Sequence, residues 1–125
     1  MTEFENQSWR RKFQNAFRGI WICVASQNSF YLHIPFAVLV VVFAVVFQVS
    51  AVEGMILAVC ITSVFALELV NTAIEYLAKA VTREESPLVK NSLDAAAGAV
   101  LIASMGSAVI GAWIFLPRLL NWLNL

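Results

Sequence analysis

Three long apolar runs dominate the chain, and each has about the length needed to cross a membrane. A helix that spans the hydrocarbon core of a bilayer needs about 20 mainly apolar residues. The pattern therefore predicts an all-α membrane protein with three transmembrane helices, at about residues 34–52, 55–81 and 93–116. A short turn is expected at Glu53-Gly54, and the polar stretch 82–92 is expected to link the last two spans.

The segment from about residue 8 to residue 27 has the pattern of an amphipathic helix. Its apolar residues recur at steps of three and four, and its basic and amide residues take the opposite face. A helix of this kind lies in the membrane interface with its basic side toward the lipid head groups. Packing against the spans alone is the alternative. The apolar face is Trp9, Phe13, Phe17, Ile20, Trp21 and Val24, and Asn28-Ser29 is expected to end the helix.

Small residues repeat every four positions along the third span. Such a ridge lets two helices approach closely and gain dispersion contacts that lipid does not match. The sequence therefore predicts close packing of this span against a neighbouring helix. The ridge consists of Ala95, Ala99, Ala103, Ser107 and Gly111.

Composition supports the assignment to a membrane. The chain of 125 residues is 61% hydrophobic and only 13% charged, whereas soluble domains carry about 25% charged residues. It forms one expected domain, residues 1–125, with no room for a separate soluble catalytic domain. Neither a P-loop nor a G-x-G-x-x-G fingerprint occurs in the sequence, which excludes an ordinary soluble kinase.

The basic residues predict how the protein is oriented in the membrane. Seven of the eight Lys and Arg residues lie before residue 19 or between residues 79 and 90. Two spans separate these regions, so both lie on the same side of the membrane. Cytoplasmic loops are enriched in Lys and Arg. We therefore expect a cytoplasmic N-terminus and a C-terminus on the opposite side.

Three polar residues stand out inside the second span. Glu68, Asn71 and Glu75 are spaced i, i+3 and i+7, which puts them on one face of a helix. A carboxylate at the centre of a bilayer costs about 2.5–3.5 kcal/mol on insertion scales, so this face is expected to meet a partner helix, a cavity or a ligand.

The depth of these groups suggests two tasks. Glu75 lies about two turns closer to the cytoplasm than Glu68, at the level of Asp94. The deep carboxylate is suited to take a proton from a lipid group, and the shallower acids are suited to hold a divalent cation and its phosphates.

Other interpretations of this polar face remain open. It could supply hydrogen bonds between helices, worth about 0.6–2 kcal/mol each, or serve an ion- or proton-conducting oligomer or a regulatory membrane subunit. His33, close to the start of the first span, is interpreted as a structural residue at the interface. Three spans surround a polar site poorly, which favours a homo-oligomer.

Four segments carry a resemblance over nearly the whole chain. They are "FQNAFRGIW" (13–21), "SFYLH" (29–33), "ELVNTAIE" (68–75) and "LDAAAGAVLIA" (93–103). With these segments the chain resembles the small bacterial diacylglycerol kinase family, which includes undecaprenol kinases. The resemblance implies a homotrimer in the bacterial cytoplasmic (inner) membrane, with no nucleic-acid partner. It also implies transfer of the γ-phosphate of ATP, with Mg²⁺, to the hydroxyl of diacylglycerol or undecaprenol.

The resemblance also implies roles for individual residues. Glu68 falls on the proposed general base and Glu75 on a metal ligand that also serves the nucleotide site. Asn71 falls on a residue that organises the site. Asp94, expected to open the third helix, and Glu84 in the linker fall on nucleotide-binding positions.

The sequence departs from the family pattern at two positions. Leu93 stands where many members have a lysine, and the flexible side chain of Lys90, one turn earlier, could reach a phosphate instead. Gln27 stands where many members have a glutamate that serves as a second metal ligand. A divergent, non-catalytic member of the family is the corresponding alternative.

Overall fold

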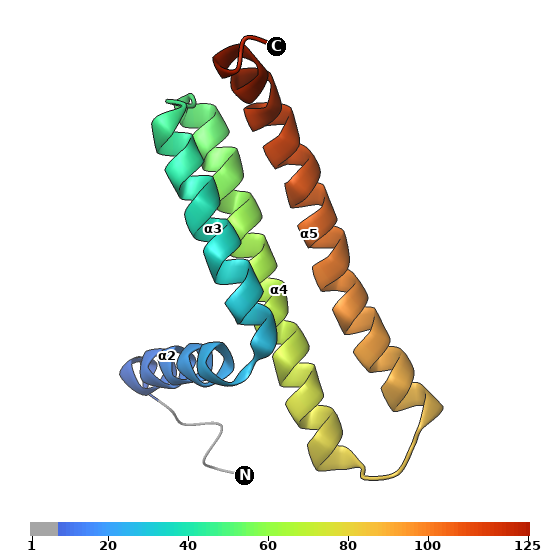
Figure 1. Ribbon diagram of the computed structural model, residues 1–125. Coiled ribbons are helices and arrows are strands. Elements are labelled where there is room, and N and C mark those ends of the chain that lie inside the picture. Colours follow the sequence, from blue (N-terminus) through green and yellow to red (C-terminus); the bar gives the residue numbers. More distant parts are fainter. Residues whose placement is uncertain (1–7) are drawn as a thin grey trace.

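The computed structural model describes residues 8–125, so the first seven residues of the expected domain lie outside the described part. The described residues form four helices joined by short connections (Figure 1). They are α2 (Trp9–Ser26), α3 (Asn28–Val46), α4 (Ala51–Val81) and α5 (Pro87–Trp122).

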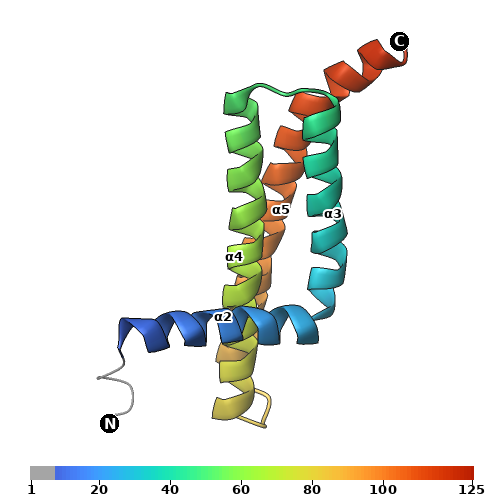
Figure 2. The same ribbon diagram turned by 90° about the vertical axis from the view of Figure 1, so that its left-hand side faces the viewer.

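The helices α3, α4 and α5 run alongside one another, and α2 lies across them near one end (Figure 2). Each of the three is long and apolar enough to cross a membrane, which confirms the prediction of three helices that could span one. The α4–α5 pair has the most extensive contact, and both α3 and α2 also pack against α4. Helix α2 and the α4–α5 connection lie at one end of the molecule, while the α3–α4 turn and the C-terminus lie at the other (Figure 1).

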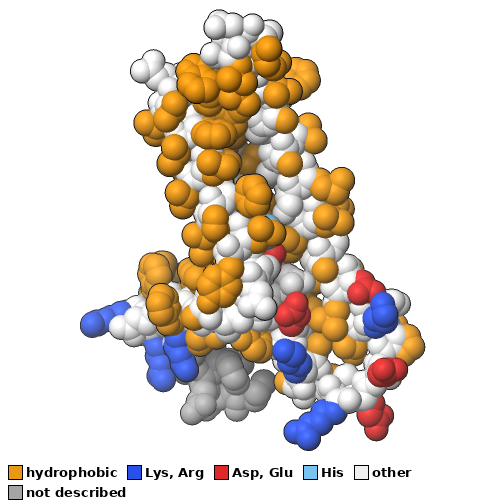
Figure 3. Space-filling model, in the orientation of Figure 1, with side chains coloured by type: hydrophobic (Ala, Val, Ile, Leu, Met, Phe, Trp, Pro, Cys, Tyr) orange, Lys and Arg blue, Asp and Glu red, His pale blue; other side chains and the backbone are white. Residues whose placement is uncertain are grey.

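A single copy of the chain buries few of its apolar side chains. Exposed examples are Val45, Ile102 and Trp113, which are 72%, 75% and 83% exposed. Figure 3 shows apolar side chains along the helices, with charged side chains gathered at the end that holds α2 and the α4–α5 connection. An apolar surface of this extent needs lipid or another protein to cover it.

The apolar face of α2 is also left uncovered. Trp9, Phe17 and Trp21 are 75%, 69% and 72% exposed. Packing against the spans alone is therefore not what the structure shows. Placement of this face in the membrane interface stays a prediction.

Aromatic contacts join the helices at two levels. Near α2, the Phe30 ring of α3 stacks on Phe65 of α4, with 5.8 Å between centroids. At the far end, Phe43 contacts both Phe47 and Phe115, the latter in α5. These pairs hold α3 in place beside α4 and α5.

The small-residue ridge of α5 is partly covered. Ala103, Ser107 and Gly111 are half-buried. They share a face with Val100 and Ile114, which are 8% and 5% exposed. A Cβ added at Gly111 would meet no atom within 4 Å, so close packing of the ridge against a neighbouring helix stays a prediction.

The expected turn at Glu53-Gly54 and the end of the first span at residue 52 are wrong. Helix α3 ends at Val46, and Gln48 adopts a positive φ of 51°. Its N–H bonds the Val45 carbonyl at 3.2 Å, as at many helix C-termini. Ser50 then caps α4 in a capping box with Glu53, so Glu53 lies in the first helical turn.

Two other predicted boundaries are also wrong. Gln27 separates α2 from α3, and Asn28 begins α3 rather than ending α2. The helix α5 begins at Pro87, after the N-cap Ser86, because proline is preorganised for the first helical position. Asp94 therefore lies two turns inside α5 and does not open it.

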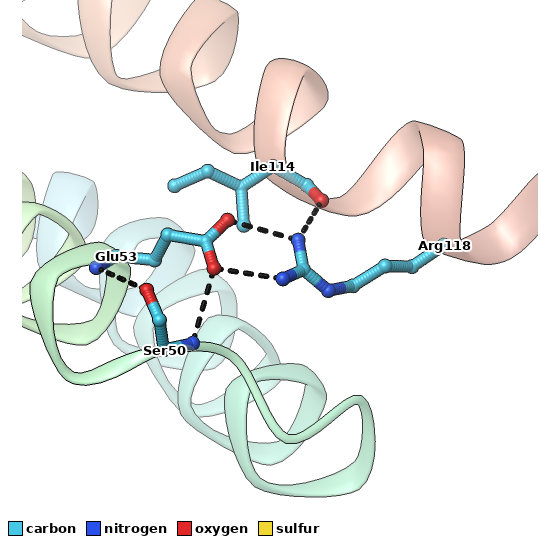
Figure 4. A network of polar contacts seen from close by, with 4 residues as sticks. All are labelled: Ser50, Glu53, Ile114 and Arg118. Carbon is cyan, nitrogen blue, oxygen red and sulfur yellow. Dashed lines mark hydrogen bonds and ion pairs between the residues drawn. The ribbon is translucent and has the colours of Figure 1, made fainter.

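An ion pair closes the far end of the molecule (Figure 4). Arg118 of α5 donates from its two terminal nitrogens to the two carboxylate oxygens of Glu53, at 2.9 and 2.7 Å. It also donates to the Ile114 carbonyl at 2.7 Å, and the backbone N–H of Ser50 bonds Glu53 at 3.0 Å. The start of α4 is thereby tied to the end of α5.

Candidate active site

A cleft of about 340 Å³ opens where the α2–α3 junction meets α4 and α5. It gathers residues that are far apart in the sequence but that the packing of these four helices brings together. Three of the predicted site residues on α4 face it, together with Gln27. The lining is Ser26, Gln27, Asn28, Ser29, Glu68, Asn71, Glu75, Ala97 and Val100.

Glu68 is the deepest acid of the cleft and is only 4% exposed. The Ser29 hydroxyl donates to its Oε2 at 2.9 Å, and His33 Nε2 lies 3.0 Å from its Oε1. The Thr72 hydroxyl donates to the Glu68 backbone carbonyl at 2.8 Å. Each carboxylate oxygen thus has a polar partner, which offsets much of the cost of burying the group.

Glu75 lies about two turns further toward the end of the bundle that holds α2 and is half-buried. Asn71 donates from Nδ2 to Glu75 Oε1 at 3.1 Å, which restricts the orientation of that carboxylate. Gln27 lines the same cleft. The cleft therefore offers carboxylate and amide oxygens, the ligand type that Mg²⁺ prefers.

A second cleft of about 250 Å³ lies between the end of α4 and the start of α5, and Glu75 belongs to both clefts. Glu84 lines the second cleft, next to the basic Lys79 and Arg83. The Thr82 hydroxyl accepts the Glu84 backbone N–H at 3.0 Å and so tightens the connection.

Lys90 and Asp94 line neither cleft as it stands. Lys90 Nζ lies 2.6 Å from Asp94 Oδ2, and the two side chains are 74% and 64% exposed. Leu93, between them in sequence, does line the second cleft. The structure therefore brings Gln27, Asn71 and Glu75 to Glu68, but it leaves this ion pair at the surface beside the connection.

Sequence reasoning missed the role of α3 in this site. The sequence pattern predicts Ser29 at a helix end and His33 as a structural residue at the interface. Both contact Glu68, from 39 and 35 positions away. The spacing of Ser29 and His33 was a readable signal, because residues four apart share a helix face. The predicted start of the span at residue 34 left both residues outside the helix.

No cluster of three or more His, Cys, Asp or Glu side chains suited to a metal occurs within residues 8–125. Among these residues two carboxylates, Glu68 and Glu75, line the first cleft with Gln27 and Asn71, and Glu75 is the one that Asn71 bonds. A Mg²⁺ ion bound together with a nucleotide commonly uses only one or two carboxylates, the phosphates supplying other ligands. The donor set is compatible with such an ion.

Comparison with known proteins adds independent findings. The family description "Prokaryotic diacylglycerol kinase" matches residues 14–115. The chain is 39% identical to an undecaprenol kinase of Bacillus subtilis over 109 residues, which cover 87% of this chain and 89% of that protein. It is 34% identical to a diacylglycerol kinase of Synechocystis sp. over 110 residues, covering 87% of this chain and 63% of the relative.

Proposed function

This chain belongs to the prokaryotic diacylglycerol kinase family, and we propose that it phosphorylates the hydroxyl of a membrane lipid with Glu68 as the general base. It is a membrane protein and a lipid kinase. The observation that carries the role of Glu68 is its position: a buried carboxylate that lines an open cleft among three candidate spans. A conducting oligomer and a non-catalytic member of the family are not favoured.

The reaction places a proton on Glu68. The O–H bond of the lipid breaks, and its proton passes to a Glu68 oxygen while the lipid oxygen bonds the γ-phosphorus. The bond from that phosphorus to the bridging oxygen breaks, and ADP leaves with the electron pair. Catalysis of phosphoryl transfer depends mainly on positioning and on neutralising charge, so a small helical site can support it.

Glu75 would hold Mg²⁺, with Gln27 as a weaker, uncharged ligand and Asn71 orienting the Glu75 carboxylate. The ion supplies neutralisation of the phosphate charge when it is bound. The fit of this oxygen-rich cleft supports the assignment.

The second cleft would take the nucleotide, because it shares Glu75 with the first and carries Lys79 and Arg83 near Glu84. Lys90 and Asp94 would join it only after their exposed ion pair rearranged toward the nucleotide. Two adjoining clefts with one common carboxylate suit a reaction between a lipid and a nucleotide.

The topology we propose has the α2 end of the molecule in the cytoplasm and the C-terminus across the cytoplasmic (inner) membrane. Figure 3 supports it, since Lys and Arg side chains gather at the α2 end, and cytoplasmic segments are enriched in these residues. A reporter fused after Leu125 should be active outside the cytoplasm. Activity confined to the cytoplasm would overturn this orientation.

We also propose a homotrimer, because one copy leaves much of its apolar surface and the open side of its cleft uncovered. The mass of the purified protein in detergent, measured by light scattering with the detergent contribution subtracted, should correspond to three chains. A monomer that retains full activity would contradict this proposal.

The proposed activity is tested by incubating purified protein with γ-labelled ATP and one lipid at a time. Undecaprenol is the first lipid to test, because the relative that is 39% identical is named an undecaprenol kinase. Diacylglycerol is the second. Label should appear in extracted lipid, with ADP formed in equal amount. ADP formed without labelled lipid, or no turnover with either lipid, would contradict the proposal.

A further inference from the structure

Helix α3 holds the proposed base at two points. Ser29 and His33 are four residues apart, so both project from one face of α3 toward α4. One contacts Glu68 Oε2 at 2.9 Å and the other lies 3.0 Å from Oε1. A single contact would leave the carboxylate plane free to rotate, whereas two contacts on different oxygens fix it.

The remaining capacity of the carboxylate faces the cleft. An ionised carboxylate can accept about four hydrogen bonds, and these two contacts use one on each oxygen. Glu68 still lines the cleft, so a lipid hydroxyl can approach an unused lone pair. The direction of that lone pair depends on how the plane is held.

Packing between α3 and α4 fixes the positions of Ser29 and His33 beside Glu68. Phe30, next to Ser29, is 1% exposed and stacks on Phe65, three residues before Glu68. The His33 side chain is 20% exposed, so protein packs around most of the ring. The position of the imidazole is therefore set by the α3–α4 contact and not by solvent.

We propose that His33 is a positioning residue of the kinase: through Nε2–H bonded to Glu68 Oε1, it orients the carboxylate that receives the proton of the lipid hydroxyl. This inference rests on the proposed function of Glu68. Outer residues that orient a reactive group typically change activity by about 10–100-fold when they are removed. A histidine that only filled space beside Glu68 would affect stability and leave the chemical step unchanged.

The first test separates the N–H donor from the bulk of the side chain. His33→Leu should lower kcat about 10–100-fold with little change in KM for ATP. His33→Gln, which offers an amide N–H at a similar reach, should restore kcat to within about fivefold of the wild type. Tyr31→Phe is the matched control, because it also removes one polar group from α3 at a side chain that is 69% exposed, and it should leave kcat unchanged.

The second test asks whether His33 acts through Glu68. Adding His33→Leu to Glu68→Gln should cause no further loss of kcat, because groups that act as a unit are strongly non-additive. A further loss of 10-fold or more in the double variant would overturn the inference. So would a His33→Leu protein with near wild-type kcat.

The third test does not depend on turnover and covers the case in which His33→Leu fails to assemble. The chain has one histidine, so its imidazole ¹⁵N resonances are assigned without ambiguity. Glu68→Gln should shift them, while Glu75→Gln, the same loss of charge about 10 Å along the helix axis, should leave them in place. Resonances unmoved by Glu68→Gln would overturn the contact.

These outcomes also separate the inference from the proposed function. A wild-type protein that phosphorylates no lipid refutes the proposed function and the positioning role of His33 together. An active wild type whose His33→Leu variant is equally active refutes the inference alone.

Discussion

Helix α4 carries two carboxylates with contrasting surroundings, Glu53 at its start and Glu68 near its middle. The Glu53 side chain is 27% exposed and is bonded by both terminal nitrogens of Arg118. The Glu68 side chain is 6% exposed, and its partners are a hydroxyl and an imidazole. Glu53, the more accessible acid, is paired with an arginine, which is always charged. Glu68, the more deeply buried acid, contacts no Lys or Arg side chain among residues 8–125.

The proposed roles, structural for Glu53 and reactive for Glu68, follow this difference in surroundings. Arg118 and the Ser50 N–H occupy the oxygens of Glu53 with charged and backbone donors, and such charge-assisted, bidentate contacts are strong and geometrically specific. Glu68 borders a cleft, where the proposed role leaves its remaining lone pairs to a substrate. Two acids of one helix therefore have different partners, according to which side chains the neighbouring helices place beside them.

The largest effect on activity is expected from a change at Glu68, the proposed reactive carboxylate of this comparison. Glu68→Gln keeps the shape of the side chain but removes the basic oxygen. Turnover should fall by about 10² to 10⁴, while assembly and ATP binding persist. Glu53→Gln, the same change in the other carboxylate, serves as the control and should keep turnover within about twofold when it is assayed well below its melting temperature. Equal losses in the two variants would remove the distinction.

A smaller effect is expected at Gln27, an uncharged residue in the cleft that contains Glu68. Gln27→Glu adds a third carboxylate to the first cleft, which Glu68 and Glu75 already line. The Mg²⁺ concentration for half-maximal activity should fall by about 3- to 10-fold, since charged oxygens bind the ion better than an amide oxygen does. Asn28→Asp is a control with the same added charge at an adjacent lining position. A dependence on Mg²⁺ that only Asn28→Asp altered would place the ligand elsewhere.

The smallest effect on activity is expected at the structural end. Arg118→Leu leaves Glu53 half-buried without its cation, so the melting temperature in detergent should fall by a few degrees while kcat stays within about twofold. Adding Glu53→Gln should recover part of the loss, because the unpaired charge is then gone. A double variant less stable than Arg118→Leu would argue that Glu53 stabilises the turn mainly through its capping box with Ser50.

The sequence supported the site unevenly. The polar face of α4 could be predicted, because helical periodicity puts Glu68, Asn71 and Glu75 on one side of the helix, and all three line the first cleft. The position of Asp94 within α5 could not be predicted, because the apolar pattern does not show that this helix begins at Pro87. The Ser-Pro pair that starts this helix was itself a readable signal.

The α3–α4 turn illustrates the same limit. The Ser50–Glu53 capping box was encoded in four adjacent residues, yet the dipeptide Glu53-Gly54 looked like a turn because it interrupted an apolar run. Local hydrogen bonds at a helix start outweigh the polarity of a single residue. Span boundaries drawn from hydropathy alone therefore shifted by several residues.

The sequence by itself determined that three helices are long enough to cross a membrane and which side chains share a face, because length and periodicity are local properties. Only the tertiary structure decided which faces meet. Ser29 and His33 reach Glu68 across 39 and 35 positions, and Arg118 reaches Glu53 across 65. These pairings depend on how α3 and α5 lie against α4, which is set by side-chain packing along the whole length of the helices.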